Sequence, residues 1–177
     1  MSFAVISYSL TGNNRKLAAA AAAALTAEHI EINMGKRQAI SAIILDMMLG
    51  RTPKVQPHPS KLERYDRVLF FAPVWMGKVA SPLRAYLKQL KAHPQPYAFA
   101  SISGGALNPN PKLAEDITKR AGSRPAAFLD LHIADLFAPK SKATMKETGD
   151  YLLNDGDIKK LVGILEASPV WRFGRYE

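Results

Sequence analysis

The sequence predicts an α/β protein, a three-layer sandwich in which a five-stranded parallel sheet has helices on both faces. Two observations lead to this prediction. Short apolar runs alternate with helix-forming segments along the chain, and this alternation is typical of parallel sheets wrapped by helices. The run "RVLFFAP" (residues 67–73) is apolar throughout its centre, as expected for a strand that is buried on both faces. Right-handed crossovers between five such strands favour the order 2-1-3-4-5.

The predicted strands are short runs of β-prone residues. The first of them, "FAVI", carries no charge, which predicts a buried strand near the beginning of the sequence. We expect strands at residues 3–6, 29–32, 67–73, 97–102 and 126–133.

The predicted helices alternate with these strands. The first contains seven consecutive alanines, and alanine has the highest intrinsic helix propensity. The second ends at Gly50, a residue type that is common just after helix C-termini. Ser81 is the expected N-cap of the third helix, with Pro82 in its first position. We expect helices at residues 15–26, 38–49, 81–92, 112–121 and 157–167.

The composition is that of an ordinary globular protein, with 47% apolar and 22% charged residues. The 177 residues suit a single domain, residues 1–177, whose aromatic C-terminal tail at 169–177 packs on the body or on a partner. The chain has no cysteine, which excludes disulfides, thiolate metal sites and a cysteine nucleophile and is compatible with the cytoplasm. The four histidines show no metal-ligand spacing, so no metal is expected.

The formal net charge of +9 permits acidic partners. The basic residues are scattered and lack a recognition motif or interleaved aromatics, so nucleic acid is not an expected partner. The most apolar run, residues 17–25, is about half as long as a membrane span. We therefore expect a cytoplasmic protein, and the aromatic tail leaves a homodimer open.

The segment "SYSLTGNN" (residues 7–14) places hydroxyl, amide and glycine residues between the first strand and the first helix. A helix N-terminus presents free backbone N–H groups and partial positive charge, so a phosphate binds there readily. Thr11 and Asn13 can donate to phosphate oxygens, and Gly12 lets the backbone approach. A simpler role, in which Thr11 or Asn13 only caps the helix, stays open. Because five of the six residues 9–14 are of this kind, the segment favours an anion site.

Two further loops follow the third and fourth strands and so lie at the same edge of the sheet. In "PVWMGKVASP" (residues 73–82), Trp75 lies between Pro73 and Gly77 in a loop, where it can stack on a flat aromatic ligand. The alternative is that Trp75 anchors this loop on the core. The backbone of "SISGGALNPNP" (residues 101–111) can donate to the edge of a ring, and the alternative is a plain strand-to-helix turn. Together the three loops predict a site for a mononucleotide with a large aromatic head.

These segments resemble the flavin-binding loops of the flavodoxin family. The Ser-x-Thr-Gly-Asn pattern is similar to the family's phosphate loop, "APVWMGKVASP" to its second flavin loop and "SISGGA" to its third, over residues 1–136 in matching order. The resemblance implies a flavodoxin-like sandwich with FMN as its cofactor. It implies that Ser9, Thr11, Gly12, Asn13 and Asn14 hold the phosphate, that Pro73, Val74, Trp75, Met76 and Gly77 line the isoalloxazine ring, and that Ser103, Gly104 and Gly105 approach its pyrimidine edge.

Two features depart from the electron-carrier flavodoxins. Asn14 stands where the family usually has threonine, and the chain is basic where the carriers are typically acidic. The third loop also lacks the acidic residues and the second aromatic that commonly cover the flavin in those carriers. The resemblance therefore implies an FMN-dependent oxidoreductase that moves electrons from NAD(P)H to a quinone or similar acceptor, with no catalytic side chain identified. The alternative is a flavodoxin-type electron carrier that docks an acidic redox partner protein.

Overall fold

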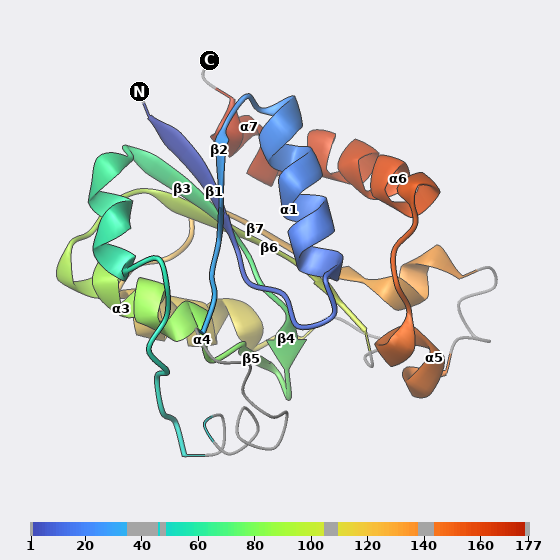
Figure 1. Cartoon of the computed structure of the whole chain (residues 1–177), viewed down its shortest axis with the longest axis horizontal. Coiled ribbons are helices and arrows are strands. Elements are labelled where there is room, and N and C mark those ends of the chain that lie inside the picture. Colours follow the sequence, from blue (N-terminus) through green and yellow to red (C-terminus); the bar gives the residue numbers. More distant parts are fainter. Residues whose placement is uncertain (1, 35–45, 47–48, 105–109, 138–143, 176–177) are drawn as a thin grey trace.

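Five parallel strands form the central sheet of the computed structural model, which describes residues 2–34, 46, 49–104, 110–137 and 144–175. Their order is β2-β1-β3-β6-β7 (Figure 1). Numbered within this sheet alone, the order is 2-1-3-4-5, so the predicted fold class is confirmed. The strands are β1 (Phe3–Ser7), β2 (Glu28–Glu31), β3 (Arg67–Phe71), β6 (Tyr97–Ser103) and β7 (Ala127–His132).

The central strands β1 and β3 are buried because helices cover both faces of the sheet. Ala4 and Ile6 of β1 and Val68 and Phe70 of β3 have no exposed surface. Ala4 pairs with Val68, and Ile6 pairs with Phe70. The uninterrupted apolar sequence of these strands suits a position in the middle of the sheet, where no face is in contact with water.

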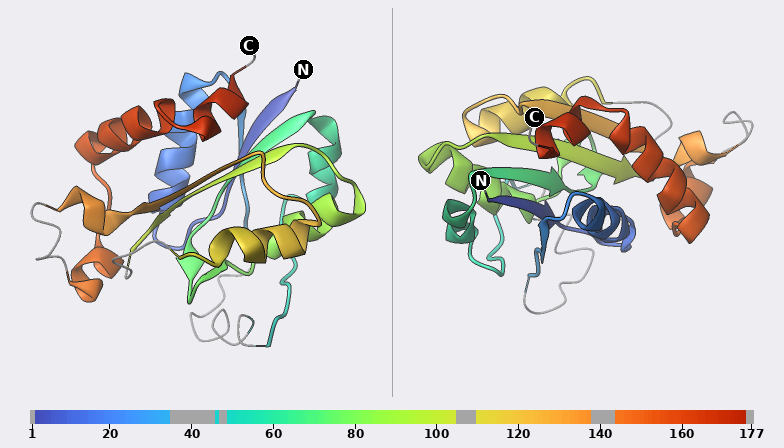
Figure 2. Two further views of the ribbon diagram at one scale, coloured as in Figure 1. Left: turned by 180° about the vertical axis from the view of Figure 1, so that it is seen from behind. Right: turned by 90° about the horizontal axis from the view of Figure 1, so that it is seen from above.

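Two layers of helices enclose the sheet (Figure 2). Successive side chains of a strand point to opposite faces, so Ile6 packs into one core cluster and Val5 into the other. In the described part of the chain, none of the helices is long and apolar enough to span a bilayer. One layer consists of α3 (Leu83–Ala92), α4 (Leu113–Ala121) and the 3-10 helix η1 (Pro59–Arg64), and the other consists of α1 (Asn13–Ala24), α6 (Asp155–Glu166) and α7 (Pro169–Gly174).

The start of α1 differs from the prediction. The helix begins at Asn13 rather than at residue 15, because Gly12 already takes the N-cap position. Gly12 has a φ of 99°, in the left-handed region that favours glycine. Asn13 and Asn14 are therefore part of the first helical turn and not of the preceding loop.

The start of α3 also differs from the prediction. The helix begins at Leu83, and Pro82 takes the N-cap position without a side-chain hydrogen bond. The prediction that Ser81 caps this helix is wrong, because Ser81 is buried and its Oγ has no hydrogen-bond partner among the described residues. The helix predicted at residues 38–49 lies almost entirely outside the described residues.

A short hairpin follows β3 that the apolar pattern did not predict. Its strands, β4 (Val74–Trp75) and β5 (Lys78–Val79), are antiparallel, and the turn residues Met76 and Gly77 have φ values of 47° and 77°. Hairpin turns with two positive φ values strongly favour Asn-Gly and related pairs. Methionine rarely takes this conformation, so the sequence gives no turn signal here.

A second element that was not predicted, α5 (Met145–Asp150), lies between β7 and α6, after the 3-10 helix η2 (Ile133–Leu136). A capping box begins it. The Glu147 backbone N–H donates to Thr144 Oγ1 at 3.2 Å, and the Thr144 backbone N–H donates to Glu147 Oε2 at 2.9 Å. The pattern Thr-x-x-Glu is a helix-start signal, so the sequence alone could have revealed α5.

The aromatic C-terminal segment packs on the body of the protein, as one of the two sequence-based alternatives expected. Residues 169–174 form α7, in which Val170 is fully buried and Trp171 is 7% exposed. The Arg67 guanidinium lies 5.7 Å from the ring centroid of Phe3 and 5.4 Å from that of Phe173, and its Nη1 donates to the Phe173 carbonyl at 2.6 Å. These contacts fasten α7 beside the first residues of β1 and β3.

We predict that Trp171→Ala destabilises the protein by about 3–5 kcal/mol, because it removes a large buried side chain from the core. Urea unfolding followed by circular dichroism measures this change. Ile164→Ala, at a residue that is 40% exposed on α6, is the control and should change the stability by no more than about 0.5 kcal/mol. Equal stability of the two variants would show that α7 is not part of the cooperative core.

Candidate functional site

The three loops singled out in the sequence meet at the carboxyl edge of the sheet, around a pocket of about 160 Å³. Each loop contributes residues to its wall. The pocket is lined by Ser9, Leu10, Thr11, Asn13, Asn14, Pro73, Val74, Trp75, Ile102, Ser103, Gly104, Ile133 and Gly149.

The first wall is the N-terminus of α1, which no side chain caps. The capping role that stayed open for Thr11 or Asn13 is therefore wrong. The Gly12 backbone N–H donates to Ser9 Oγ at 3.0 Å, which closes the loop before the helix. The first-turn N–H groups have no partner within the helix and carry its partial positive charge. This arrangement suits an anion.

The side chains of Asn13 and Asn14 are buried and bind backbone groups from other segments. Asn14 Nδ2 donates to the Ile102 carbonyl at 2.8 Å, and its Oδ1 accepts from the Ile102 N–H at 3.0 Å. Asn13 makes the same kind of pair, donating to the Tyr151 carbonyl at 2.8 Å and accepting from the Leu153 N–H at 3.1 Å. An amide has a separate donor and acceptor atom, so each of these side chains satisfies a backbone carbonyl and a backbone N–H at the same time. The amide of Asn14 is thus occupied by backbone groups of Ile102.

A segment that sequence reasoning missed closes one end of the pocket. Gly149 of α5 lines it, and a Cβ at Gly104 would collide with the Thr148 carbonyl oxygen. Lys16 Nζ donates to the Leu153 carbonyl at 2.8 Å and fastens the chain after α5 to α1. Glycine is required at position 104 because the backbones of α5 and of the third loop approach each other so closely.

Trp75 lines the pocket and also packs on the core. Its ring and that of Tyr8 form a T-shaped pair, with a centroid distance of 6.0 Å and an interplanar angle of 85°. The Val74 N–H donates to Ser103 Oγ at 3.1 Å, which ties the hairpin to β6. Burial raises the pKa of Tyr8 to about 12, so this phenol stays neutral at physiological pH. The anchoring role considered for Trp75 thus applies, on a hairpin strand rather than in a loop, and its stacking on a ligand stays a prediction.

Four of the other predicted site residues lie away from this pocket or outside the described residues. Met76 and Gly77 form the hairpin turn and line a second hollow beside α4. Gly12 takes the N-cap position of α1 but does not line the pocket. Gly105 lies outside the described residues. A Cβ at Gly77 would collide with the side-chain amide of Asn110, so the second and third loops touch at this point.

A buried carboxylate anchors the end of the third loop. Asp130 on β7, with its side chain 5% exposed, accepts hydrogen bonds from Ser101 Oγ at 2.5 Å and from the Asn110 N–H at 3.3 Å. His132 Nε2 lies 3.3 Å from the same carboxylate. Burial alone would raise the pKa of Asp130, but the interactions with His132 and Ser101 together outweigh burial and lower this pKa. Among the described residues, no group of three or more His, Asp or Glu side chains could hold a metal ion.

Comparison with known proteins identifies the fold. The chain is similar to a flavoprotein from Lactobacillus acidophilus NCFM solved in complex with FMN, with 23% identity, a TM-score of 0.57 and coverage of 80% of this chain and 99% of that one. Oxidised flavodoxin 1 from Bacillus cereus shares 16% identity at a TM-score of 0.52, covering 93% and 94%. The Trp repressor binding protein from Bacillus subtilis shares 17% identity at a TM-score of 0.52, covering 99% and 100%. The chain has a flavodoxin-like fold. No protein-family model matches the sequence, and neither does any curated protein.

In this flavodoxin-like fold the pocket lies where the strand order reverses. β2 pairs with one side of β1 and β3 with the other, so the chains leaving β1 and β3 depart to opposite faces of the sheet. Ligands of open α/β sheets bind in the crevice that opens at such a point. The location of the pocket thus follows from the topology, and its chemistry follows from the loops.

We predict that Asn14→Ala destabilises the protein by about 2–4 kcal/mol, because it leaves the buried N–H and carbonyl groups of Ile102 without their partner. The free energy of unfolding in urea measures this effect. Asn33→Ala, at an exposed amide, is the matched control and should have almost no effect. A similarly small effect of both substitutions would show that the amide pair of Asn14 does not stabilise the fold.

Proposed function

We propose that this protein is an FMN-binding oxidoreductase that moves electrons from NAD(P)H to a quinone or similar acceptor. The observation that carries the FMN proposal is the uncapped N-terminus of α1 facing a pocket whose other walls are Trp75 and the β6 loop. The flavodoxin-like fold supports it, and so does the Lactobacillus acidophilus protein of similar fold, which was solved with FMN.

The pocket would hold the phosphate end of the cofactor. Its volume of about 160 Å³ lies below the roughly 300–1,000 Å³ of typical ligand pockets. It suits a phosphate and the adjoining part of the ribityl chain, and the flat ring would continue outward along Trp75. The backbone N–H groups of the first helical turn would bind the phosphate, because the side chains of Asn13 and Asn14 are engaged elsewhere. The hydroxyls of Ser9 and Thr11 would add donors.

The ring would lie between the hairpin and the third loop. Bound FMN supplies the hydride and electron chemistry, and the protein contributes binding and orientation. Tyr8 and Ser103 hold the hairpin that carries Trp75, so the tryptophan ring is held in place before a ligand binds. The residues proposed to border the ring are Pro73, Val74, Trp75, Met76 and Gly77, and those proposed at its pyrimidine edge are Ser103, Gly104 and Gly105.

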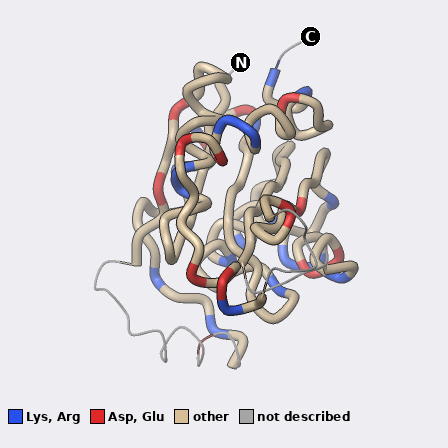
Figure 3. Tube along the Cα trace, turned by 90° about the vertical axis from the view of Figure 1, so that its right-hand side faces the viewer, with Lys and Arg blue, Asp and Glu red and all other residues tan. Residues whose placement is uncertain are grey.

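The distribution of Lys and Arg indicates which classes of molecule the protein attracts. Lys and Arg are spread over many described elements and do not gather on one of them (Figure 3). This pattern does not favour a nucleic-acid surface, which is normally a continuous basic patch. The general positive charge still attracts anionic molecules such as dinucleotides. We propose a cytoplasmic location.

We predict that FMN binds at least about a hundredfold more tightly than riboflavin, because only FMN places a charged phosphate at the α1 N-terminus. Quenching of flavin fluorescence measures both affinities. Thr11→Glu should abolish this preference by placing a carboxylate in the phosphate loop, and Thr52→Glu, at an exposed position outside the pocket lining, should preserve it. Equal affinities of the wild type for FMN and riboflavin would refute the phosphate site.

The oxidoreductase proposal is tested by turnover. We predict that the FMN-loaded protein oxidises NADH or NADPH and reduces a benzoquinone, with absorbance at 340 nm as the readout. Free FMN at the same concentration is the control for reaction outside the protein. A bound flavin that is reduced by dithionite but not by either nicotinamide would exclude the enzyme and leave the electron carrier.

A further inference from the structure

A second hollow adjoins the hairpin that carries Trp75. Its volume is about 420 Å³, within the range of sites that hold organic ligands. Met76, Gly77 and Lys78 of the hairpin form one wall, and residues along α4 form the other. We call this hollow the α4 groove. The groove and the 160 Å³ pocket are therefore lined by consecutive residues of one short hairpin.

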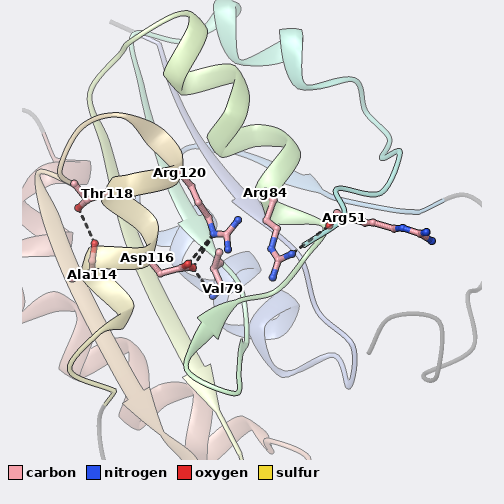
Figure 4. Close-up of polar contacts among 7 residues, drawn as sticks. All are labelled: Arg51, Val79, Arg84, Ala114, Asp116, Thr118 and Arg120. Atoms are coloured by element: carbon pink, nitrogen blue, oxygen red, sulfur yellow. Dashed lines mark hydrogen bonds and ion pairs between the residues drawn. The ribbon is translucent and has the colours of Figure 1, made fainter. Parts of the chain in front are cut away.

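The two walls of the α4 groove are fixed to each other. The Val79 N–H donates to Asp116 Oδ2 at 3.3 Å, and the Asn110 side chain packs against Gly77. Asp116 is in turn held by Arg120, whose Nε lies 3.0 and 2.9 Å from its two oxygens (Figure 4). The hollow thus has a defined shape, because hydrogen bonds connect the hairpin to the helix.

The free charges in the groove are mostly positive. Lys78, Lys112 and Lys119 line it, and none of them forms an ion pair with another described residue. The charge of Asp116 is compensated by Arg120. A ligand with negative charge is therefore favoured.

The order of charges along α4 narrows the class of ligand. Lys112, Glu115 and Lys119 are three and four residues apart and so share one face of the helix. The two lysines lie about 10 Å apart along the axis, with the carboxylate between them. Ammonium groups bind phosphates, and a carboxylate accepts hydrogen bonds from ribose hydroxyls. The alternation fits a nucleotide, whereas Glu115 would repel a ligand that carries only negative groups.

We propose that the α4 groove binds the phosphate and ribose portion of NADH or NADPH. This inference rests on the proposed function, because it places the nicotinamide at the hairpin turn where the flavin ring is expected. Met76, with 71% of its surface exposed, offers an apolar contact for that ring at the mouth of the groove. The lysines hold the phosphates, and Glu115 between them holds a ribose diol.

The test compares two hydride donors on the FMN-loaded protein. NADPH carries phosphates, whereas N-benzyl-dihydronicotinamide has the same reacting ring without them. Lys112→Glu combined with Lys119→Glu should raise the KM for NADPH by roughly tenfold or more and leave turnover with the benzyl compound unchanged. Lys159→Glu with Lys160→Glu, exposed on α6 in the opposite helix layer, changes the net charge equally and should leave both donors unaffected.

Calorimetric titration with NADP⁺ separates this inference from the oxidoreductase proposal. NADP⁺ binding that weakens in the α4 variant but not in the α6 variant supports the groove, even in a protein that turns over neither donor. An unchanged KM for NADPH, an equal loss with both donors, or NADP⁺ binding that is absent or insensitive to the α4 substitutions would overturn it. Flavin affinity, measured alongside, shows whether the cofactor site is intact in each variant.

Discussion

The first turn of α1 is the constraint on which the rest of the site depends. The side-chain amides of Asn13 and Asn14 bind backbone N–H and carbonyl groups at the end of β6 and in residues 151–153. Without them, these backbone groups would lack hydrogen-bond partners. Buried backbone groups must be satisfied, so these four hydrogen bonds fix where α1 begins relative to the sheet. Since tertiary contacts hold the helix start, no side chain is needed as a cap. The N–H groups of the first turn lack partners within the helix, so an anion in the pocket can accept their hydrogen bonds.

The hairpin depends on its surroundings in a similar way. Strands of two residues do not stabilise themselves in water. β4 is held through Val74 by Ser103, and β5 is held through Val79 by Asp116, so the hairpin is attached to β6 at one end and to α4 at the other. Met76 keeps a positive φ because both flanking strands are fixed. One short element thus shapes both the 160 Å³ pocket and the α4 groove.

The sheet and most helices could be predicted because apolar runs and alanine-rich stretches are local signals. The position of the three loops followed from the same reasoning, since parallel strands end at one edge. The roles of individual residues in these loops could not be predicted from the sequence. The sequence suggested that Asn14 donates a hydrogen bond to a phosphate, but its amide binds the backbone of Ile102, a residue far away in the chain. Gly104 was expected to approach the edge of a ring or to form a plain strand-to-helix turn, but glycine is required there by the close approach of Thr148. Both depend on contacts between distant segments, which no local pattern records.

The surroundings of the end of β6 differ in charge between the two faces of the sheet. Ile102 lies on the face of the sheet covered by α1, and its neighbour Ser101 points to the opposite face, where it binds Asp130. The lowered pKa of Asp130 keeps this carboxylate ionised at neutral pH. The positive end of α1 and a buried negative charge therefore lie on opposite faces of one strand end. The end of α1 attracts an anion, whereas the charge of Asp130 faces His132, whose Nε2 lies 3.3 Å away. The positive end of α1 therefore agrees with the proposed orientation, in which the anionic end of the ligand lies at residues 9–14.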